Sequence, residues 1–425
     1  MAKKMMLMVY IRKLTWERAR SYLLAFAFSL VTLALVFYPK EGFEAAYQGL
    51  RIFLDVVFPA LLPFFVLSEI LLGMGIVHFL GVFLEPLMRP LFNVPGVGAF
   101  AMSMGLVAGY PMDAVITAKF RENKMCTRIE GERLLAFTNT ADPLFMFGAV
   151  AVGMFGMPQL GMTLAIAHYA ASLTVGIVYR FYGRRAEPLP APSSNRKGNM
   201  VYRAFQELYR ARKEDGRPVG TLLGDSVRGS VETLVMICGF IMLFSVVVKV
   251  LSVSGVTRLV MPAVAGALRI FGMAPSLATA IIGGALEIDV GAMAAAKAAA
   301  PLIDRVAVAS AVIAWSGLSV HGQVATVIRG TDIRMSAYVL ARFVHAFAAG
   351  LYAYLLMGPA ETLVRSIHLP VLARIAGSSG NLAYSRPFLD SLVFGGTLFV
   401  WSLGIMVGLA LVLQLARKLD ALLRQ

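Results

Sequence analysis

The sequence predicts an all-α polytopic membrane protein with about eight transmembrane helices and two re-entrant hairpins, built from two inverted-topology repeats. Composition is the first observation: of 425 residues, 58% are hydrophobic and only 15% are charged, and the mean hydropathy is +0.74. Such a chain is too apolar for a water-soluble globule. Apolar runs near the ~20 residues that cross a bilayer recur along it, beginning with Ser21 to Tyr38.

Internal similarity is the second observation. Landmarks of the first half, Ser68, Phe92, Gly105 and His168, recur as Ser245, Phe271, Gly283 and His345, at separations of 177, 179, 178 and 177 residues. A pair of similar halves in a membrane protein is the sequence signature of a repeat transporter fold. The alternative is generic similarity among Gly- and Ala-rich membrane helices.

Basic residues beside the apolar runs predict the topology. The N-terminus is basic and therefore cytoplasmic, so the first helix runs outward and Val57 to Met74 returns. Val97 to Ala118 is interrupted by Gly and Pro and is followed by basic residues, which favours a re-entrant hairpin over a crossing. Leu134 to Gly153 then crosses outward, and Leu160 to Phe181 crosses back.

The second half follows the same plan from the opposite face. Val231 to Leu251 crosses, Pro275 to Ala299 forms the matching hairpin, and Val306 to Val327 and Ala337 to Met357 complete the unit. The final helix, Ser391 to Gln414, ends in basic residues and places the C-terminus in the cytoplasm. The resulting segments are an N-terminal anchor (1–56), a first repeat (57–181), a basic cytoplasmic connector (182–230), a second repeat (231–357), an extracytoplasmic loop (358–390) and a C-terminal helix (391–425).

Several functional classes are disfavoured by the residues. The formal charge of +15 lies in short segments beside apolar runs, where it orients helices and meets anionic lipid rather than nucleic acid. Cys126 and Cys238 are the two cysteines and lack ligand spacing, so no metal site or disulfide framework is expected. No catalytic arrangement or nucleotide-binding loop appears, so we expect a protein that is not an enzyme and that uses a coupled ion, such as a proton or sodium, or the solute gradient.

Broken helices predict the solute site, because interrupted backbone leaves polar groups near the membrane midplane. The hairpin tips are Ala108 to Ala114 and Gly283 to Ala292, and the next helices break at Asn139 to Pro143 and Ser316 to Gln323. The candidate solute-binding residues are Gly109, Tyr110, Pro111, Asn139, Thr140, Asp142, Glu287, Asp289, Lys297, Ser316, Ser319, His321 and Gln323.

Each charged candidate has a simpler alternative. Glu287 and Asp289 lie in apolar surroundings, where they bind solute or a coupling ion, or else form a turn exposed to water. The alternative for Asp142 is a helix N-cap. Lys297 matches Lys119 of the first half, and both are also explained as lysines that reach to the membrane interface. His168 and His345 are expected to make interhelical hydrogen bonds.

Specific motifs resemble the sporulation integral membrane protein YlbJ family, also called SpoVV, within the wider group that carries the nucleoside-recognition Gate domain. They are Phe58 to Leu71, Leu84 to Phe100, Ala108 to Met112, Asn139 to Phe155 and Ser316 to Val324. The resemblance implies a protein of the mother-cell-derived outer forespore membrane that moves dipicolinic acid during sporulation. Its related group leaves nucleoside-type or other carboxylate transport as an alternative.

A function of another class also stays open, a membrane assembly or scaffold protein that recruits partners through the basic connector. The expected partners are thus a small anionic solute and membrane lipid, with a homo-oligomer or sporulation membrane proteins as further possibilities and no nucleic acid.

Overall fold

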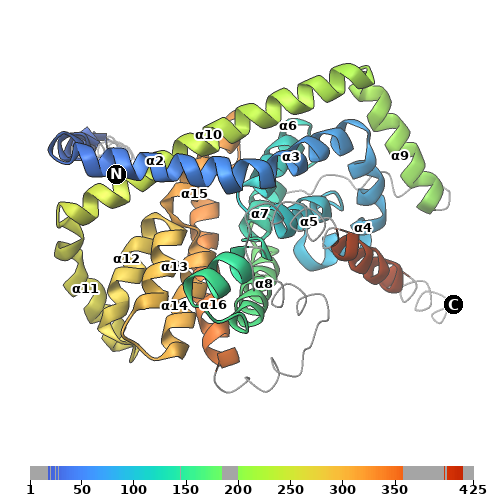
Figure 1. The fold of residues 1–425 in the computed structure, drawn as a ribbon. Coiled ribbons are helices and arrows are strands. Elements are labelled where there is room, and N and C mark those ends of the chain that lie inside the picture. The colour runs from blue at the N-terminus through green and yellow to red at the C-terminus, as the bar shows by residue number, and fades with distance from the viewer. Residues whose placement is uncertain are drawn as a thin grey trace, which may run out of the picture.

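The computed structural model describes residues 18–183, 200–357 and 397–414, with single gaps at residues 20, 24, 27, 144, 398 and 399 (Figure 1). The basic N-terminal residues before residue 18, part of the connector (184–199), the predicted loop 358–390 and the start of the final helix lie outside the described residues. Within the described residues the fold is helical and contains no strand, as the sequence predicts.

The first half starts with a helix over Ser21–Phe37 that bends by 105° into the next element. Its remaining elements are α2 (Pro39–Ile52), the π-helix η1 (Phe53–Val57), α3 (Phe58–Gly73), α4 (Ile76–Phe92), α5 (Gly98–Ala108), α6 (Met112–Glu122), α7 (Arg128–Thr138), the π-helix η2 (Phe145–Met154) and α8 (Leu160–Tyr179).

The second half repeats most of this order. Its elements are α9 (Met200–Asp215), α10 (Val219–Val253), α11 (Val256–Ile270), the short 3₁₀ turn η3 (Pro275–Leu277), α12 (Ala278–Leu286), α13 (Ile288–Lys297), α14 (Leu302–Trp315), α15 (Gly317–Val327), the 3₁₀ turn η4 (Ile328–Gly330) and α16 (Met335–Met357). A last apolar helix covers Val400–Gln414. Both α4 and α11 begin directly after a left-handed glycine, Gly75 and Gly255.

Fewer helices have full membrane-spanning length than the eight that the sequence predicts. In the described part of the chain four do so by length and composition, Leu160–Tyr179, Val219–Val253, Leu302–Gly330 and Met335–Met357, and up to six if each of two bent pairs is one span. The shortfall has a local cause. The α3 segment stops where Gly75 turns left-handed, and α4 leaves at 82° from it, while the predicted crossing at Leu134 to Gly153 is divided into α7 and η2.

The segments predicted as hairpins each consist of two short helices that pack on one another, α5 with α6 and α12 with α13. In the second pair, an added Cβ on Gly283 would lie 3.0 Å from Val290, and one on Gly291 would overlap the backbone of Gly284. Glycine at these positions therefore permits the close approach of α12 and α13.

The matching helices α8 and α16 pack side by side in opposite directions. Tyr179 Oη donates to the carbonyl of Ala337 at 2.9 Å, and His345 Nε2 donates to the carbonyl of His168 at 3.0 Å. Residue numbers rise along α8 while those of the partners fall along α16, so the two helices are antiparallel. The hydrogen bond from His345 to α8 confirms the interhelical role predicted for His345. His168 differs, since its Nε2 accepts from the backbone N–H of Ala141, in the non-helical segment after α7.

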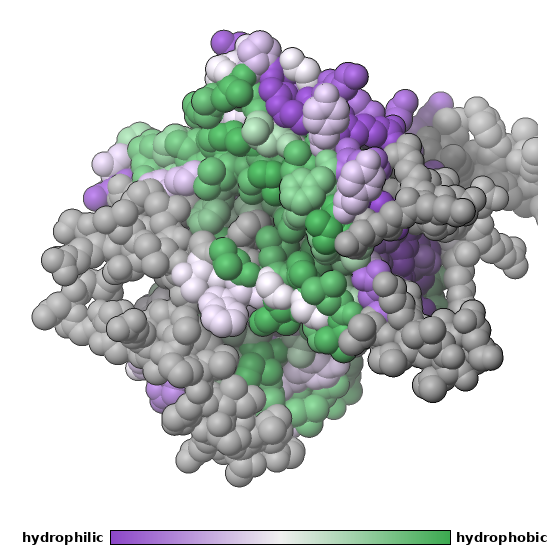
Figure 2. Space-filling view, turned by 90° about the vertical axis from the view of Figure 1, so that its right-hand side faces the viewer, coloured by the Kyte–Doolittle hydropathy of each residue, from purple (hydrophilic) through white to green (hydrophobic). Residues whose placement is uncertain are grey.

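Apolar side chains cover much of the outside, as expected for contact with lipid. Figure 2 shows a broad hydrophobic face whose hydrophilic residues gather mainly toward one end. Large exposed side chains include Leu259, Ile270, Phe271, Phe343 and Phe347. One buried cluster joins the two halves, since it contains Leu135 and Leu164 together with Val306, Ile313 and Tyr338.

Candidate functional site

Two helices that match one another in sequence end inside the protein. Helix α7 stops at Thr138, and residues Asn139 to Asp142 are not helical. Helix α14 stops at Trp315, after which Ser316 and Gly317 adopt left-handed φ values of 69° and 65°. A left-handed serine is unusual, and it separates α14 from α15. Each break leaves carbonyl groups at a helix C-terminus that need donors from elsewhere.

Arg342 of α16 supplies these donors. Its side chain is 0% exposed. Nη1 donates to the carbonyl of Asn139 at 2.5 Å and to that of Ala314 at 3.4 Å, and Nη2 donates to the carbonyl of Ala136 at 2.5 Å. The C-terminal end of a helix carries partial negative charge. One guanidinium therefore neutralises the ends of both interrupted helices at once.

Asn139 links this cation to a buried carboxylate. Its Nδ2 donates to Asp113 Oδ1 of α6 at 2.8 Å, and Thr138 Oγ1 lies 3.1 Å from Asp113 Oδ2. Its Oδ1 accepts from Tyr338 Oη of α16 at 2.8 Å. The hydroxyl of Tyr338 also lies 3.2 Å from Ser316 Oγ. Asn139 thus joins α6, α7 and α16, and Tyr338 extends the network to α14. We call Asp113, Asn139, Ser316, Tyr338 and Arg342 the central polar cluster.

The first hairpin tip reaches this cluster. Tyr110 Oη donates to the carbonyl of Ile313, one turn before the break in α14, at 2.8 Å. Gly109 has a φ of +67°, and an added Cβ there would lie 2.9 Å from Asp142 Oδ2. Pro111 is buried and precedes α6. The structure therefore brings these predicted residues together with Asn139.

The second tip lies against the break in α14. Glu287 Oε1 accepts from the backbone of Ile288 at 3.0 Å and caps α13. A Cβ added to Gly317 would lie 3.1 Å from the Cα of Glu287. Asp289 follows in the first turn of α13 and is exposed. Both carboxylates lie at the tip, which is consistent with a solute or ion role and with the exposed-turn alternative.

The remaining polar candidates surround the cluster. Thr140 is buried. His321 Nδ1 donates to the carbonyl of Gly317 at 2.7 Å, and its ring centroid is 5.1 Å from that of Tyr338. Ser319 and Gln323 are buried on the same helix, with Gln323 Nε2 3.5 Å from Ser319 Oγ. Asp142 Oδ1 accepts from the backbone of Phe145, which agrees with the N-cap alternative.

Lys297 lies away from the central polar cluster. It is the last residue of α13, at the opposite end from Glu287, and it is exposed. Its counterpart Lys119 forms an ion pair with Glu69 of α3. The position of Lys297 agrees with the interfacial alternative.

Sequence reasoning missed Asp113, Tyr338 and Arg342. Asp113 belongs to the first hairpin tip, directly beside residues that were selected. Arg342 is the one ionisable residue other than His345 and the tyrosines between Met335 and Met357, within an apolar helix. A lone arginine in such a helix is itself the signal, because an ionised side chain there has a large desolvation cost.

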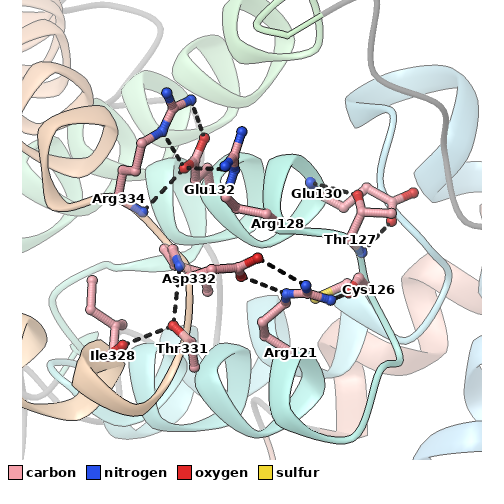
Figure 3. Close-up of polar contacts among 11 residues, drawn as sticks. Arg121, Cys126, Thr127, Arg128, Glu130, Glu132, Ile328, Thr331, Asp332 and Arg334 are labelled. Carbon is pink, nitrogen blue, oxygen red and sulfur yellow. Dashed lines mark hydrogen bonds and ion pairs between the residues drawn. The ribbon is translucent and has the colours of Figure 1, made fainter.

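A second polar cluster joins the two halves (Figure 3). Arg121, in the last turn of α6, makes two contacts with Asp332, Nε–Oδ1 at 2.7 Å and Nη2–Oδ2 at 2.9 Å. Glu132 of α7 accepts from Arg334 Nε at 2.8 Å and Nη2 at 3.1 Å, and from Tyr182 Oη at 2.8 Å. We call these five residues the peripheral ion cluster.

Partners set the pKa of both acids of this cluster. Burial raises the pKa of Glu132, but hydrogen bonds from Arg334 and Tyr182 lower it by more than burial raises it. The pKa of Glu132 therefore lies below the ordinary glutamate value. The hydrogen bond from Arg121 holds the pKa of Asp332 below the ordinary aspartate value. Both acids therefore stay ionised at neutral pH and hold the two halves together.

Comparison with known proteins gives the family. The Gate family model, described as nucleoside recognition, matches residues 54–183. The chain is 40% identical over 375 residues to the sporulation integral membrane protein YlbJ of Bacillus subtilis (strain 168), which covers 87% of this chain and 90% of the relative. No solved structure matches this chain. With its Gate region, its apolar helices and this relative, the chain belongs to the YlbJ family of sporulation integral membrane proteins.

Proposed function

We propose that this protein is a secondary transporter or facilitator of a small polar or anionic solute, and that the solute is dipicolinic acid. The observation that carries the proposal is the central polar cluster, in which two interrupted helices from the two halves end around one buried arginine. Broken helices that meet inside an apolar bundle are the arrangement in which transporters bind polar solutes.

Inverted repeats would let such a site open to either side in turn. Support comes from α8 and α16, which match at a spacing of 177 residues between His168 and His345 and which run antiparallel. The order of the elements supports it too, since a two-helix hairpin, a broken helix and a long helix follow one another in each half. On this proposal both hairpins are re-entrant and both termini lie in the cytoplasm.

An anionic solute suits the ends of the short helices. Helices α6, α13 and α15 begin at Met112, Ile288 and Gly317, next to the residues that form the central polar cluster or contact it. Helix N-termini carry partial positive charge and unpaired N–H groups. Asn139, Ser316 and the tip residues Glu287 and Asp289 would supply hydrogen bonds or hold a coupling ion such as a proton or sodium.

Flux measurements test the proposal directly. Purified protein in liposomes is expected to take up labelled dipicolinate above empty vesicles, and Glu287→Gln or Asp289→Asn is expected to reduce uptake while insertion stays normal. Lys297→Gln is the matched control, because it lies at the opposite end of α13. If the wild type shows no flux under every ion gradient that is imposed, the proposal is contradicted. Normal flux in both acid variants would instead favour the alternative that Glu287 and Asp289 form a turn exposed to water.

The description of the Gate family favours a second solute class. The same liposomes incubated with labelled uridine test nucleoside transport, and uptake of uridine but not dipicolinate would reassign the solute. A scaffold role predicts a different outcome. Replacing residues 184–199 with a neutral linker would then abolish recruitment of partners and leave flux unchanged.

The resemblance to the YlbJ family supports the outer forespore membrane as the location. A fluorescent fusion in a sporulating bacterium is expected to outline the forespore only when it is expressed in the mother cell. Signal confined to the vegetative cell membrane would contradict this location.

A further inference from the structure

We infer that Asp113 is the coupling proton site of this protein, and that a proton on Asp113 frees the charge of Arg342 to bind an anionic solute. The inference rests on the proposed transport function and adds to it the coupling ion, its residue and the residue that senses it. No carboxylate of the first hairpin was among the residues predicted from the sequence.

Asp113 is a buried acid whose carboxylate accepts hydrogen bonds from the uncharged side chains of Asn139 and Thr138. Its side chain is 0% exposed. Its two oxygens accept from the amide of Asn139 at 2.8 Å and the hydroxyl of Thr138 at 3.1 Å, and it forms no ion pair among the described residues. An ionised carboxylate that is removed from water and held only by neutral groups needs a nearby opposite charge.

Arg342 carries the opposite charge that Asp113 needs, and Asn139 links the two side chains. The carbonyl of Asn139 accepts from Arg342 Nη1 at 2.5 Å while the amide of Asn139 donates to Asp113. Asn139 thus connects both ions, since its backbone carbonyl accepts from Arg342 and its side-chain amide donates to Asp113. The pair is neutral as a whole when Asp113 is ionised.

Arg342 still has capacity for another acceptor. Its Nε is buried and has no hydrogen-bond partner among the described residues, and the same holds for Nε2 of His321. Both side chains contact the ring of Tyr338, with the Arg342 Cζ 5.5 Å and the His321 ring 5.1 Å from the ring centroid. The unpartnered N–H of Arg342 Nε suits a carboxylate group on a planar solute. Nε2 of His321 is an acceptor instead, because Nδ1 of the ring carries the proton that is donated to Gly317, and it suits an N–H or O–H group of the solute.

Few other ionisable groups face this pair. Tyr110 comes from the first hairpin tip, Tyr338 from α16 and His321 from α15, while α5, which packs on α6, carries no ionisable residue. His168 of α8 and His345 of α16 lie beyond Arg342, with their ring centroids 4.7 Å apart. Asp142, which lies beside Gly109, is the other acid at this tip.

Charge balance then couples the proton to the anion. The proton adds to a carboxylate oxygen of Asp113 and gives the neutral acid, while Arg342 keeps its proton. The central polar cluster then has one positive charge in excess, and a bound carboxylate neutralises it. By linkage the anion equally favours protonation of Asp113, so both are expected to cross together.

The first experiment needs no solute. Infrared difference spectra of the full protein in lipid are recorded as the pH is lowered, and the wild type is expected to gain a carboxylic acid carbonyl band that Asp113→Asn lacks. Asp304→Asn is the matched control, because Asp304 is also buried, in the first turn of α14. The inference is overturned if the band persists in Asp113→Asn.

The second experiment measures coupling with dipicolinate as the probe. Wild-type uptake is expected to rise about tenfold for each unit of external acidification while proton binding limits it, and uptake by Asp113→Asn is expected to be independent of pH. An equal pH slope in both proteins overturns the inference. If the wild type moves no dipicolinate but Asp113→Asn removes the infrared band, the proposed solute fails and the proton site is supported.

Discussion

Removing the charge of Arg342 is expected to destabilise the protein strongly, because several buried polar groups lose their hydrogen-bond donor or counter-charge at once. Arg342→Gln removes the donors to the carbonyls of Ala136, Asn139 and Ala314 and leaves Asp113 as a buried charge without its counter-ion. Asp113 and Arg342 make no direct ion pair, but each buried carbonyl that is left without a donor costs about 1–3 kcal/mol. We therefore expect a loss of about 4 kcal/mol in the free energy of unfolding, roughly a thousandfold in the equilibrium constant.

The double variant tests the physical reason. Asp113→Asn removes the remaining charge but keeps an oxygen that accepts from Asn139. Residues within one hydrogen-bonded network show interaction energies of about 0.5–3 kcal/mol. The double variant Asp113→Asn, Arg342→Gln is thus expected to be about 2 kcal/mol more stable than the sum of the two single changes predicts.

Reversible unfolding in mixed dodecylmaltoside and SDS micelles measures these differences. Circular dichroism follows the helices. With Trp16 and Trp401 replaced by Phe in every variant, the fluorescence of Trp315 reports on the break in α14, since Trp315 precedes Ser316. Arg329→Gln is the control, because Arg329 is an exposed arginine of η4. Additivity of the two changes to within about 0.5 kcal/mol would refute the electrostatic link between Asp113 and Arg342.

Three further predictions concern the periphery and the hairpins. Glu132→Gln should destabilise the protein at neutral pH but not in acid. The pKa of Glu132 is lowered in the folded state, so its carboxylate stabilises the folded protein above the unfolded-state pKa of about 4.3, and this contribution is lost as the pH falls through the folded-state pKa. A wild-type advantage in stability that persists in strong acid contradicts this. Asp332→Asn should cost only about 0.5 kcal/mol and less in high salt, because its side chain is half exposed, and a larger loss would show that the pair is shielded from solvent. Gly291→Val should prevent the second hairpin from closing and reduce the yield of folded protein, whereas Gly239→Val, with open space at its Cβ, should not; equal yields would refute the close approach of α12 and α13.

The broken helices were visible in the sequence because their cause is local. Asn139 to Pro143 and Ser316 to Gln323 contain Pro, Gly and small polar residues within apolar runs, and such residues interrupt a helix wherever it packs. The divisions between α5 and α6 and between α12 and α13 were visible for the same reason. Tyr338 and Arg342 were not selected, since they lie in an unbroken helix whose pattern says nothing of what the side chains contact.

Only the tertiary structure separated the two matching lysines from the acids of the hairpin tips. Both hairpin regions contain polar residues at each end, but a helix of ten residues places its ends about 15 Å apart. Glu287 therefore lies against Gly317 while Lys297 is exposed at the far end of α13. Similarity of position in the sequence indicated that Lys119 and Lys297 match, but not that either reaches the centre.

The sequence by itself indicated that the protein lies in a membrane, that it is helical and where its helices break, because hydropathy and backbone preference act over short stretches of chain. The tertiary structure decided which breaks meet. Asp113, Asn139 and Arg342 are separated by up to 229 positions in the chain. Only packing of α6, α7 and α16 sets the carboxylate of Asp113 against the side-chain amide of Asn139 and the guanidinium of Arg342 against its backbone carbonyl. Charge balance inside an apolar protein depends on such distances, which no local pattern encodes.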